Sequence, residues 1–442
     1  MSLWQHCAQR IEEVLRRYPV PQNVSFTYGT AGFRTTGSLL ISVGCRMAFV
    51  CALRSIVSGG KSTGLMITAS HNPAIDNGVK IVDTDGCMLS RDWEAYATTI
   101  ANAATSDELV TATNKFIEQQ SLTISADKAR VHVARDTRLT GPDILESFVS
   151  GCAALCFSGS TQPMVDVVDH RITTTPQLHT MVHLDNRGEK NPTTELYYSR
   201  IASAFSSLAS RSQRQRVVVD CGNGVGTVAV RSLLEKHPEL SDFVTFVLVN
   251  DCIESQELLN EKCGADYTQK TKEVPPIFFD HAAQDPSTLF VSFDGDADRV
   301  VAFHVDPVKR TAALLDGDRI AILLTTLIRN VFGDGADALN RLDVGIVQTA
   351  YANGASSAFV ARTLKLRSYC AATGVKYLHP VAEERDIGVY FEANGHGTVL
   401  FHDESLDREL ATFPKARNEL AMLAQLLSQV CGDALGDTLA VM

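Results

Sequence analysis

Hydrophobic residues recur along the chain in two alternating patterns. Short apolar runs rich in β-branched residues are separated by helix-length segments in which apolar and polar positions return at helical spacing. This alternation is typical of parallel strands joined by crossover helices, and it predicts the α/β fold class. The strands that we expect span Leu65 to Thr68, Val131 to Ala134, Val217 to Asp220, Phe243 to Val249, Leu289 to Phe293 and Val344 to Gln348.

The most apolar long segment predicts a core helix. From Val43 to Val57 the charged residues are Arg46 and Arg54, eight positions apart, which places both on one face of a helix and leaves the opposite face buried. We expect an amphipathic core helix and not a membrane span. The N-terminal segment from Met1 to Arg17 has helical spacing but no uninterrupted apolar core, so we expect no secretory signal.

The length of 442 residues predicts about three domains at the usual ~150 residues each. The polar stretch from Leu184 to Thr194 is typical of a linker, and a second boundary is expected near Asp306-Pro307. Similar patterns of strand, glycine-rich turn and helix in the second and third parts suggest that the domains resemble one another. The domains that we expect are 1–190, 191–305 and 306–430, followed by a short segment at 431–442.

Charge and cysteine content narrow the possible partners. With 40 Lys and Arg against 51 Asp and Glu, the net charge of −11 argues against a nucleic-acid surface, and an anionic substrate would need a local basic pocket. The eleven cysteines include no C-x-x-C pair and are expected to be reduced, mostly buried thiols. We therefore expect a cytoplasmic protein with a small-molecule substrate, without membrane attachment and without an evident obligate protein partner.

Three alternating carboxylates follow the strand expected at Leu289 to Phe293. In a loop, Asp294, Asp296 and Asp298 can converge on an oxygen-seeking divalent cation. The glycine and glutamate positions of an EF-hand are filled by other residues, which excludes that motif. A solvated acidic turn is the plainer alternative. Arg299 favours the metal site, because a guanidinium beside metal-directed carboxylates would face a phosphate held by the same ion.

One serine lies at the mouth of an expected strand. Ser70 follows the apolar run Leu65 to Ile67 among turn-forming residues, where it could carry a phosphoryl group. A purely structural turn or helix cap is the alternative. A tight turn at Asn77-Gly78 would return Lys80 towards this serine, with a cation able to shuttle protons. Serine, cation site and basic residues together predict phosphoryl transfer.

Four sequence blocks carry a resemblance to a known family. They are Tyr28-Gly29-Thr30-Ala31-Gly32-Phe33-Arg34, Thr68-Ala69-Ser70-His71-Asn72-Pro73, Asp294-Gly295-Asp296-Ala297-Asp298-Arg299 and Phe391-Glu392-Ala393-Asn394-Gly395-His396-Gly397-Thr398. In this order they resemble the α-D-phosphohexomutases and, among them, the eukaryotic phosphoacetylglucosamine mutases. The segment Val347 to Gly354 and the alanine before Ser70 indicate this subgroup.

The resemblance implies an intramolecular phosphotransferase that interconverts N-acetylglucosamine 6-phosphate and 1-phosphate, in UDP-N-acetylglucosamine biosynthesis. It implies tandem α/β domains with mixed, largely parallel sheets, and a sugar 1,6-bisphosphate as intermediate and activator. One Mg²⁺ would be held by Ser70, Asp294, Asp296 and Asp298. The catalytic residues would be Ser70 as a phosphoserine, His71, Lys80 and Arg299. The substrate would be bound by Arg34, Lys376, Glu392, Asn394 and His396.

Two further features follow from the resemblance. The block Arg135-Asp136-Thr137-Arg138 matches another part of the family and is expected to form a structural ion network near the site. The family's fourth domain carries an Arg-Pro-Ser-Gly-Thr-Glu-like loop that anchors the phosphate not being transferred. No such segment occurs here, and we expect residues 431–442 to be a stub leading to that absent domain. Two alternatives stay open: a weakly active or inactive truncated homologue with a binding or regulatory role, and a mutase for glucose or mannose phosphates.

Overall fold

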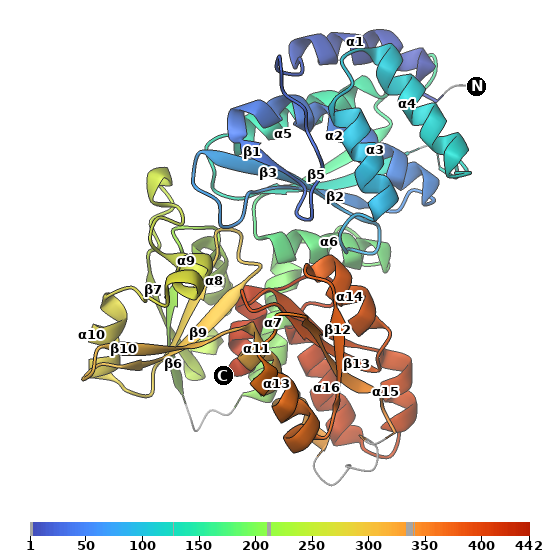
Figure 1. Cartoon of the computed structure of the whole chain (residues 1–442). Coiled ribbons are helices and arrows are strands. Elements are labelled where there is room, and N and C mark those ends of the chain that lie inside the picture. The colour runs from blue at the N-terminus through green and yellow to red at the C-terminus, as the bar shows by residue number, and fades with distance from the viewer. Residues whose placement is uncertain (1–2, 127, 210–213, 333–338, 340) are drawn as a thin grey trace. The chain divides into compact units, whose positions relative to one another are not determined.

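The computed structural model describes residues 3–126, 128–209, 214–332, 339 and 341–442 (Figure 1). The chain forms two compact units, Met1–Thr194 and Glu195–Met442, and their boundary falls at the end of the polar stretch expected to be a linker. Sheets flanked by helices occur in both units, so the α/β fold class is confirmed.

The first unit is built on a five-stranded mixed sheet with the strand order β1-β3-β2-β4-β5. Strands β2, β4 and β5 run parallel, whereas β3 and β1 pair antiparallel at the other edge. The expected strands near Leu65 and Val131 are confirmed as β2 and β4. The strands are β1 (Phe33–Thr36), β2 (Thr63–Ile67), β3 (Asp76–Val82), β4 (Ala129–Arg135) and β5 (Val165–Ile172).

Helices cover both faces of this sheet (Figure 1). Helices α2 and α5 pack together on one side, and α6 packs against β2 and β4 on the other. Helix α6 begins with a capping box, in which Thr174 and Gln177 exchange side-chain-to-backbone hydrogen bonds. The helices are η1 (Gln5–Cys7), α1 (Ala8–Arg17), η2 (Gly37–Leu40), α2 (Ile41–Val57), α3 (Arg91–Ala101), α4 (Ser106–Gln119), α5 (Gly141–Ala154) and α6 (Thr175–Asn186).

Helix α2 is buried on nearly all sides, which corrects the expected arginine face. Arg46 is fully buried, and its guanidinium donates at 2.8–2.9 Å to the carbonyl oxygens of Tyr18, Ser42 and Ala103. These acceptors replace the water that the charged group loses on burial. Among the described residues, Gly37–Val57 is the one helical segment long and apolar enough to cross a membrane. Because 83% of its most apolar stretch is buried within the protein, it fits the predicted core helix.

The second unit contains two sheets, of which the first has the strand order β10-β9-β8-β6-β7. Strands β7, β6 and β8 are parallel, and β9 and β10 add antiparallel to the edge. The strands expected near Val217, Val244 and Leu289 are confirmed as β6, β7 and β8. Because β10 pairs with β9, this sheet continues past residue 306. The strands are β6 (Gln215–Asp220), β7 (Val244–Val249), β8 (Leu289–Phe293), β9 (Val300–Asp306) and β10 (Thr311–Leu315).

The other sheet of this unit has the strand order β12-β11-β13-β14. Strands β12, β11 and β13 are parallel, and β14 pairs antiparallel with β13. Strand β11 confirms the strand expected near Val344. The strands are β11 (Val344–Thr349), β12 (Arg367–Ala371), β13 (Ile387–Phe391) and β14 (Gly397–Phe401).

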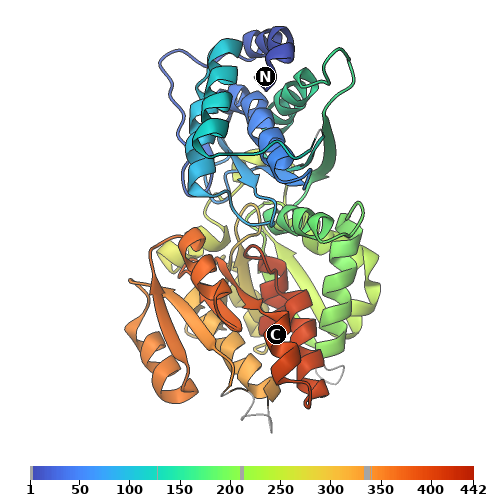
Figure 2. The same ribbon diagram turned by 90° about the vertical axis from the view of Figure 1, so that its right-hand side faces the viewer.

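Helix α17 packs against three helices and one strand of the second unit. It contacts α8, α11, α16 and β9, and the C-terminus lies among the red helices of this unit (Figure 2). The helices are α7 (Thr194–Leu208), α8 (Gly226–Lys236), η3 (Pro238–Asp242), η4 (Gln256–Leu258), α9 (Gly264–Thr271), α10 (Ile277–Gln284), α11 (Gly317–Phe332), α13 (Gly354–Phe359), η6 (Val360–Leu364), α14 (Val375–Glu383), α15 (Asp403–Glu409), α16 (Pro414–Leu426) and α17 (Ala434–Val441).

Each sheet has one connection that leads from a parallel strand into its antiparallel neighbour. We call these the serine loop (68–75, from β2 to β3), the metal loop (294–299, from β8 to β9) and the glutamate loop (392–396, from β13 to β14). All three follow the carboxyl ends of parallel strands, which is where ligand sites of α/β proteins gather. This repeated arrangement agrees with the expected resemblance between the domains.

Candidate active site

Ser70 has an unusual backbone conformation within the serine loop. Its φ of +53° places a residue other than glycine in the left-handed region, which costs free energy and often marks a functional position. The residue is fully buried, and its amide donates to Thr68 Oγ1 at 2.9 Å. The Thr68 hydroxyl donates in turn to Asp136 Oδ2 at 2.7 Å. Hydrogen bonds therefore hold the loop in the conformation that Ser70 adopts.

Arg138 stabilises the serine loop by hydrogen bonds to its backbone. Its side chain is fully buried, and Nε donates to Asp136 Oδ2 at 3.0 Å. The sequence block around it indicated an ion network near the site, but not that the network binds the catalytic loop itself. The two terminal nitrogens donate at 2.6–2.9 Å to the backbone carbonyl oxygens of Ser70, Asn72, Pro73 and Asp76.

Strand β3 brings Lys80 beside the strand that leads into the serine loop. In the antiparallel register Lys80 lies opposite Met66, and the Thr68 amide donates to Gly78 O at 3.0 Å. A Cβ added to Gly78 would lie 2.2 Å from Thr68 O, so the two backbones can approach this closely only with glycine there. The expected tight turn at Asn77-Gly78 is wrong, because both residues lie in the extended strand β3 and the chain reverses before them, in the serine loop. Lys80 itself is half-buried.

Arg34 lies on β1 and reaches the same loop. Its Nη1 donates to Asn72 Oδ1 at 3.3 Å, two residues after Ser70. The preceding turn packs closely on β3, because a Cβ at Gly32 would lie 2.3 Å from Val79 O and its φ is +84°. His71 is half-buried beside Ser70. The first unit therefore brings Arg34, Ser70 and His71 together at one loop and places Lys80 on the strand that follows this loop.

The metal loop brings three carboxylates together immediately after β8. One oxygen each from Asp294, Asp296 and Asp298 lies within 4.8 Å of the others, and all three residues are buried. A hydrogen bond from Ala297 N to Asp294 O, at 3.1 Å, closes the turn. The carboxylates converge as their alternating spacing predicts, and their burial rules out a solvated acidic turn.

Arg299 provides the counter-charge within this loop. Its Nε lies 3.6 Å from both Asp294 Oδ2 and Asp298 Oδ1. Burial by itself lowers the pKa of Arg299, but the carboxylates of Asp298, Asp294 and Asp296 outweigh it and raise that pKa above its ordinary value. The guanidinium therefore stays charged. Three negative charges against one positive leave a net formal charge of −2 in a buried loop.

This set of donors fits a hard divalent cation such as Mg²⁺. Carboxylate oxygens are the ligands that Mg²⁺ prefers, and it usually takes only a few of them while keeping waters or phosphate oxygens in its other positions. One such ion would neutralise the charge of −2 left by Asp294, Asp296, Asp298 and Arg299. The metal loop can thus hold Mg²⁺ with positions left for a phosphate group.

The glutamate loop is a tight turn stabilised by its own backbone. The Glu392 amide donates to His396 O and the Gly395 amide to Glu392 O, both at 2.9 Å. The His396 amide donates to Asn394 Oδ1 at 3.0 Å. Glu392 and His396 are buried, and Asn394 is half-exposed. These contacts hold three polar side chains on one short turn.

Glu392 also connects this turn to the segment that carries Lys376. Its Oε1 accepts a hydrogen bond from the Gly374 amide at 3.0 Å, directly before α14. Gly374 has a φ of +112°, a conformation that favours glycine. Lys376 follows in the first turn of α14 and is half-buried. The structure therefore brings Lys376 and Glu392, which lie far apart in the sequence, into one loop cluster.

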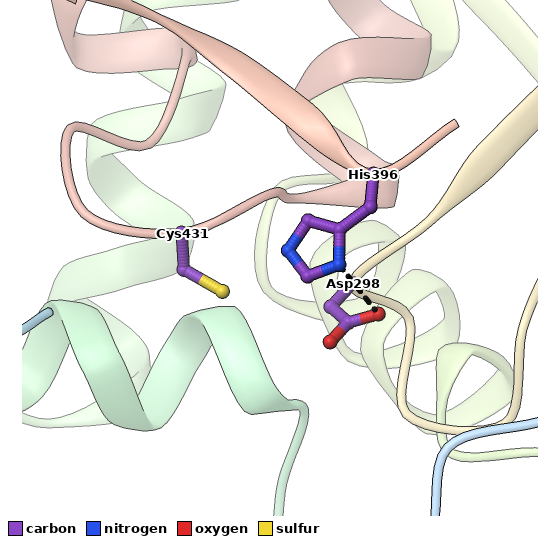
Figure 3. A group of neighbouring side chains, drawn as sticks. All are labelled: Asp298, His396 and Cys431. Carbon is purple, nitrogen blue, oxygen red and sulfur yellow. Dashed lines mark ion pairs between the residues drawn. The ribbon is translucent and has the colours of Figure 1, made fainter. Parts of the chain in front are cut away.

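The metal loop and the glutamate loop touch each other. The Val300 amide, just after the metal loop, donates to Gly395 O at 3.2 Å. His396 Nδ1 lies 3.7 Å from Asp298 Oδ1 (Figure 3). A Cβ at Gly395, whose φ is +85°, would lie 1.9 Å from Val300 O. The second unit thus joins the predicted metal ligands Asp294, Asp296 and Asp298, with Arg299, to Lys376, Glu392, Asn394 and His396.

A fourth segment packs against both loops, and sequence reasoning assigned it no role in the site. Residues 427–433, which we call the terminal loop, connect α16 to α17. The Ala434 amide donates to Ala297 O at 3.0 Å, and a Cβ at Gly432 would lie 2.5 Å from Asp298 O. Cys431 therefore lies beside Asp298 and His396. A lone cysteine in a nondescript stretch offered no sequence signal for this placement.

Three family models match the chain. They are described as phosphoacetylglucosamine mutase AMG1, domain II (residues 190–301), phosphoacetylglucosamine mutase AMG1, domain III (residues 316–442), and phosphoglucomutase/phosphomannomutase, alpha/beta/alpha domain I (residues 29–108). Together they cover the segments that hold all three site loops.

Individual relatives are similar over nearly the whole chain. The phosphoacetylglucosamine mutase of Candida albicans is 37% identical over 98% of this chain and 81% of its own length. That of Oryza sativa subsp. japonica is 40% identical over 94% and 76%, respectively. The solved Aspergillus fumigatus N-acetylphosphoglucosamine mutase with GlcNAc-6P and magnesium matches with a TM-score of 0.88 at 36% identity, over 99% of this chain and 80% of that one. The same fungal enzyme, solved with glucose 1,6-bisphosphate, matches with a TM-score of 0.87 at 36% identity, over the same shares.

Proposed function

This chain belongs to the phosphoacetylglucosamine mutase family, and on that premise we propose that it interconverts N-acetylglucosamine 6-phosphate and N-acetylglucosamine 1-phosphate. The observation that carries the proposal is the contact between the metal loop and the glutamate loop, through Val300 N and Gly395 O and through Asp298 and His396. A site for a phosphate-binding cation and a cluster of sugar-binding groups are thereby parts of one structure, as a sugar phosphotransferase needs.

We assign the phosphoryl carrier to Ser70. In the first half-reaction, a hydroxyl oxygen of the sugar monophosphate attacks the phosphorus of phosphorylated Ser70. The bond from phosphorus to the serine oxygen breaks as the bond to the sugar oxygen forms, and the product is a sugar 1,6-bisphosphate. In the second half-reaction the bisphosphate, reoriented, returns its other phosphoryl group to Ser70. The enzyme ends in its starting state and the phosphate has changed position.

Protein side chains supply the proton transfer and the charge stabilisation in this scheme. Lys80, in its neutral form, takes the proton of the attacking hydroxyl, a role typically worth ~10²–10⁴-fold in rate. Arg299 faces the phosphoryl group as it moves, and its neighbouring carboxylates keep it charged. Mg²⁺ held by Asp294, Asp296, Asp298 and a phosphoserine oxygen supplies further neutralisation of the phosphoryl charge. His71 and Arg34 support the charged group on Ser70.

The glutamate loop recognises the sugar in both of its orientations. Glu392 and Asn394 accept and donate hydrogen bonds to hydroxyls that both orientations present, and His396 lies beside them. Lys376 lies on the segment held by Glu392 and is a further substrate-binding residue in this proposal. Phosphoryl transfer, metal binding and sugar binding are thus divided among loops of the three sheets. The serine loop lies within residues 1–190, the metal loop within 191–305 and the glutamate loop within 306–430.

The wider setting is part of the same proposal. The product is a sugar 1-phosphate, which a nucleotidyltransferase can convert to a nucleotide sugar, and we place the enzyme before that step in UDP-N-acetylglucosamine biosynthesis. The eleven cysteines are all free thiols, which suits a reducing compartment, and we propose a cytoplasmic location.

Phosphorus NMR of the purified chain tests this function. The sample contains N-acetylglucosamine 6-phosphate, Mg²⁺ and a trace of sugar bisphosphate, and the 1-phosphate resonance is followed with time. We expect that resonance to appear with the natural chain and with Ser158→Ala, an exposed serine of the same unit, but not with Ser70→Ala. Binding without conversion by the natural chain would overturn the mutase proposal in favour of a binding role. Faster conversion of glucose or mannose 6-phosphate would overturn the sugar assignment.

A further inference from the structure

Asp298 belongs to a second group of possible metal ligands besides the three aspartates. Asp298, His396 and Cys431 each offer one ligand atom, these atoms lie within 4.8 Å of one another, and all three residues are buried. Figure 3 shows the three side chains approaching from the metal loop, the glutamate loop and the terminal loop, with the imidazole between the carboxylate and the thiol. The distance from His396 Nδ1 to Asp298 Oδ1 is 3.7 Å.

The backbone around this group is close-packed. The residue after Cys431 is Gly432, and a Cβ there would lie 2.5 Å from Asp298 O and 2.7 Å from His396 Cδ2. Directly after the terminal loop, the amide of Ala434, the first residue of α17, donates a hydrogen bond to Ala297 O of the metal loop. Because neighbouring backbone segments hold all three residues, the cluster is not a chance approach of three mobile surface side chains.

The chemistry of the three ligands differs from that of the aspartate set. A carboxylate, an imidazole and a thiol together are the ligands of Zn²⁺ and similar borderline ions, whereas Mg²⁺ takes oxygen ligands. A tetrahedral zinc centre with bonds of about 2.0–2.3 Å separates its ligand atoms by roughly 3.5 Å. Side-chain rotations that close the present spacing by about 1 Å would build such a centre. Three protein ligands would leave its fourth position open.

We propose that Asp298, His396 and Cys431 form a zinc-type site that competes with the magnesium site for Asp298. The Cys431 thiol loses its proton to solvent as the metal binds, and the sulfur then bonds to the metal as a thiolate. Because one Asp298 carboxylate serves both sets, occupation of the mixed site removes a ligand from the oxygen site. Zn²⁺ would therefore inhibit phosphoryl transfer, a consequence that rests on the function proposed above.

Cobalt titration of the metal-free chain of 442 residues tests the site without using activity. Co²⁺ is the probe, because it occupies zinc-type sites and a cysteine ligand adds an ultraviolet charge-transfer absorption from sulfur to cobalt. We expect this absorption with the natural chain and its removal by Zn²⁺. Excess Mg²⁺ should weaken it, since Mg²⁺ draws Asp298 into the other ligand set. The Asp296→Asn variant lacks a magnesium ligand outside the mixed site, so it should keep the absorption and need more Mg²⁺ to lose it.

Cysteine variants assign the absorption to one residue. Cys431→Val and Cys431→Ala should abolish it, whereas Cys252→Ser, which removes an exposed thiol elsewhere in the second unit, should leave it intact. Thermal melting of each variant shows whether the fold is kept, and two replacements of different size guard against one that packs poorly. Persistence of the absorption in both folded Cys431 variants overturns the site. Insensitivity of the absorption to Mg²⁺ overturns the competition.

The proposed inhibition of phosphoryl transfer by Zn²⁺ is tested by a separate measurement of turnover. In the phosphorus NMR assay with Mg²⁺ present, half-inhibition of Cys431→Val should need ~10–100-fold more Zn²⁺ than half-inhibition of the natural chain. Even substitution of a residue that only hydrogen-bonds to a metal ligand lowers metal affinity by this factor, and Cys431 would be a ligand itself. Equal Zn²⁺ sensitivity of the two proteins contradicts the proposed inhibition. Absence of turnover in both would refute the proposed function, while the cobalt titration would still decide the site.

Discussion

Arg138 offers a direct test of how the serine loop is held. A guanidinium has five N–H donors, and here all five meet acceptors. These are one carboxylate oxygen of Asp136, three backbone carbonyl oxygens of the serine loop and that of Asp76, the first residue of β3. Arg138→Lys keeps the positive charge but offers three donors at one point, so at least two acceptors lose their partner. Each buried acceptor left unsatisfied costs about 1–3 kcal/mol, which gives about 2–6 kcal/mol for the substitution.

The effect should be concentrated in the loop that Arg138 holds. Amide hydrogen exchange followed by mass spectrometry measures local opening, and a loss of about 2 kcal/mol corresponds to roughly 30-fold faster exchange. We expect at least that acceleration in peptides covering residues 69–77. The turnover of Arg138→Lys should fall at the same time, because Ser70 no longer keeps its left-handed conformation.

A matched variant separates this effect from the loss of an arginine in general. Arg171→Lys changes an exposed arginine of the same unit and should leave exchange in the serine loop unchanged. Exchange in residues 69–77 of Arg138→Lys within threefold of the natural chain would refute the reasoning, since it would show that a single ammonium group satisfies the same acceptors.

Three further predictions concern the second unit and the metal. Gly395→Ala places a Cβ 1.9 Å from Val300 O and should lower the melting temperature far more than Gly159→Ala, where φ is also positive but nothing lies within 4 Å. Equal decreases would show that backbone strain alone, and not the contact between the loops, causes the loss of stability. Burial raises the pKa of Asp433 from 3.8 to about 6, so the folded state should lose stability as the pH rises through this window and the carboxyl group ionises. In Asp433→Asn the urea midpoint of unfolding should therefore fall less between about pH 4 and pH 7 than in the natural chain. An equal fall in both proteins would contradict this assignment. Chelation with EDTA should abolish turnover and added Mg²⁺ should restore it, whereas full activity of the metal-free chain would exclude the metal loop from catalysis.

Local patterns in the sequence were sufficient for six of the parallel strands, including β2 and β8 and the loops that follow these two, but they did not indicate the antiparallel edge strands. The run Leu289 to Phe293 is apolar and β-branched enough to predict β8, and its end predicts where the three aspartates begin. The convergence of those aspartates was also predictable, because alternating carboxylates in a turn have few other ways to lie after a buried strand. The prediction that Arg46 lies on a polar face opposite the buried face of the helix at Val43 to Val57 was wrong, because Arg46 is itself buried. The sequence could not show this, since the carbonyl oxygens that accept from Arg46 include those of Tyr18 and Ala103, which lie in other segments.

In the candidate active site, too, local sequence patterns do not predict the contacts made by distant segments. Arg138 could be recognised as a charged residue in a family block, but four of its five acceptors are backbone carbonyl groups, which every residue carries, so no sequence pattern indicates which of them it meets. Cys431 gave no signal, because a single thiol becomes a candidate ligand only when Asp298 and His396 are brought beside it.

By itself, then, the sequence determined the α/β class, the positions of six parallel strands and the chemical nature of the three loops. Periodicity and short motifs are local properties, and they constrain the backbone over a few residues. Only the tertiary structure decided which charges are buried, what compensates them and which loops touch. Those outcomes depend on contacts between segments that are far apart in the sequence, such as Arg138 with Ser70 and His396 with Asp298. The free energy of burying a charge there is set by whichever donors and acceptors the fold places around it.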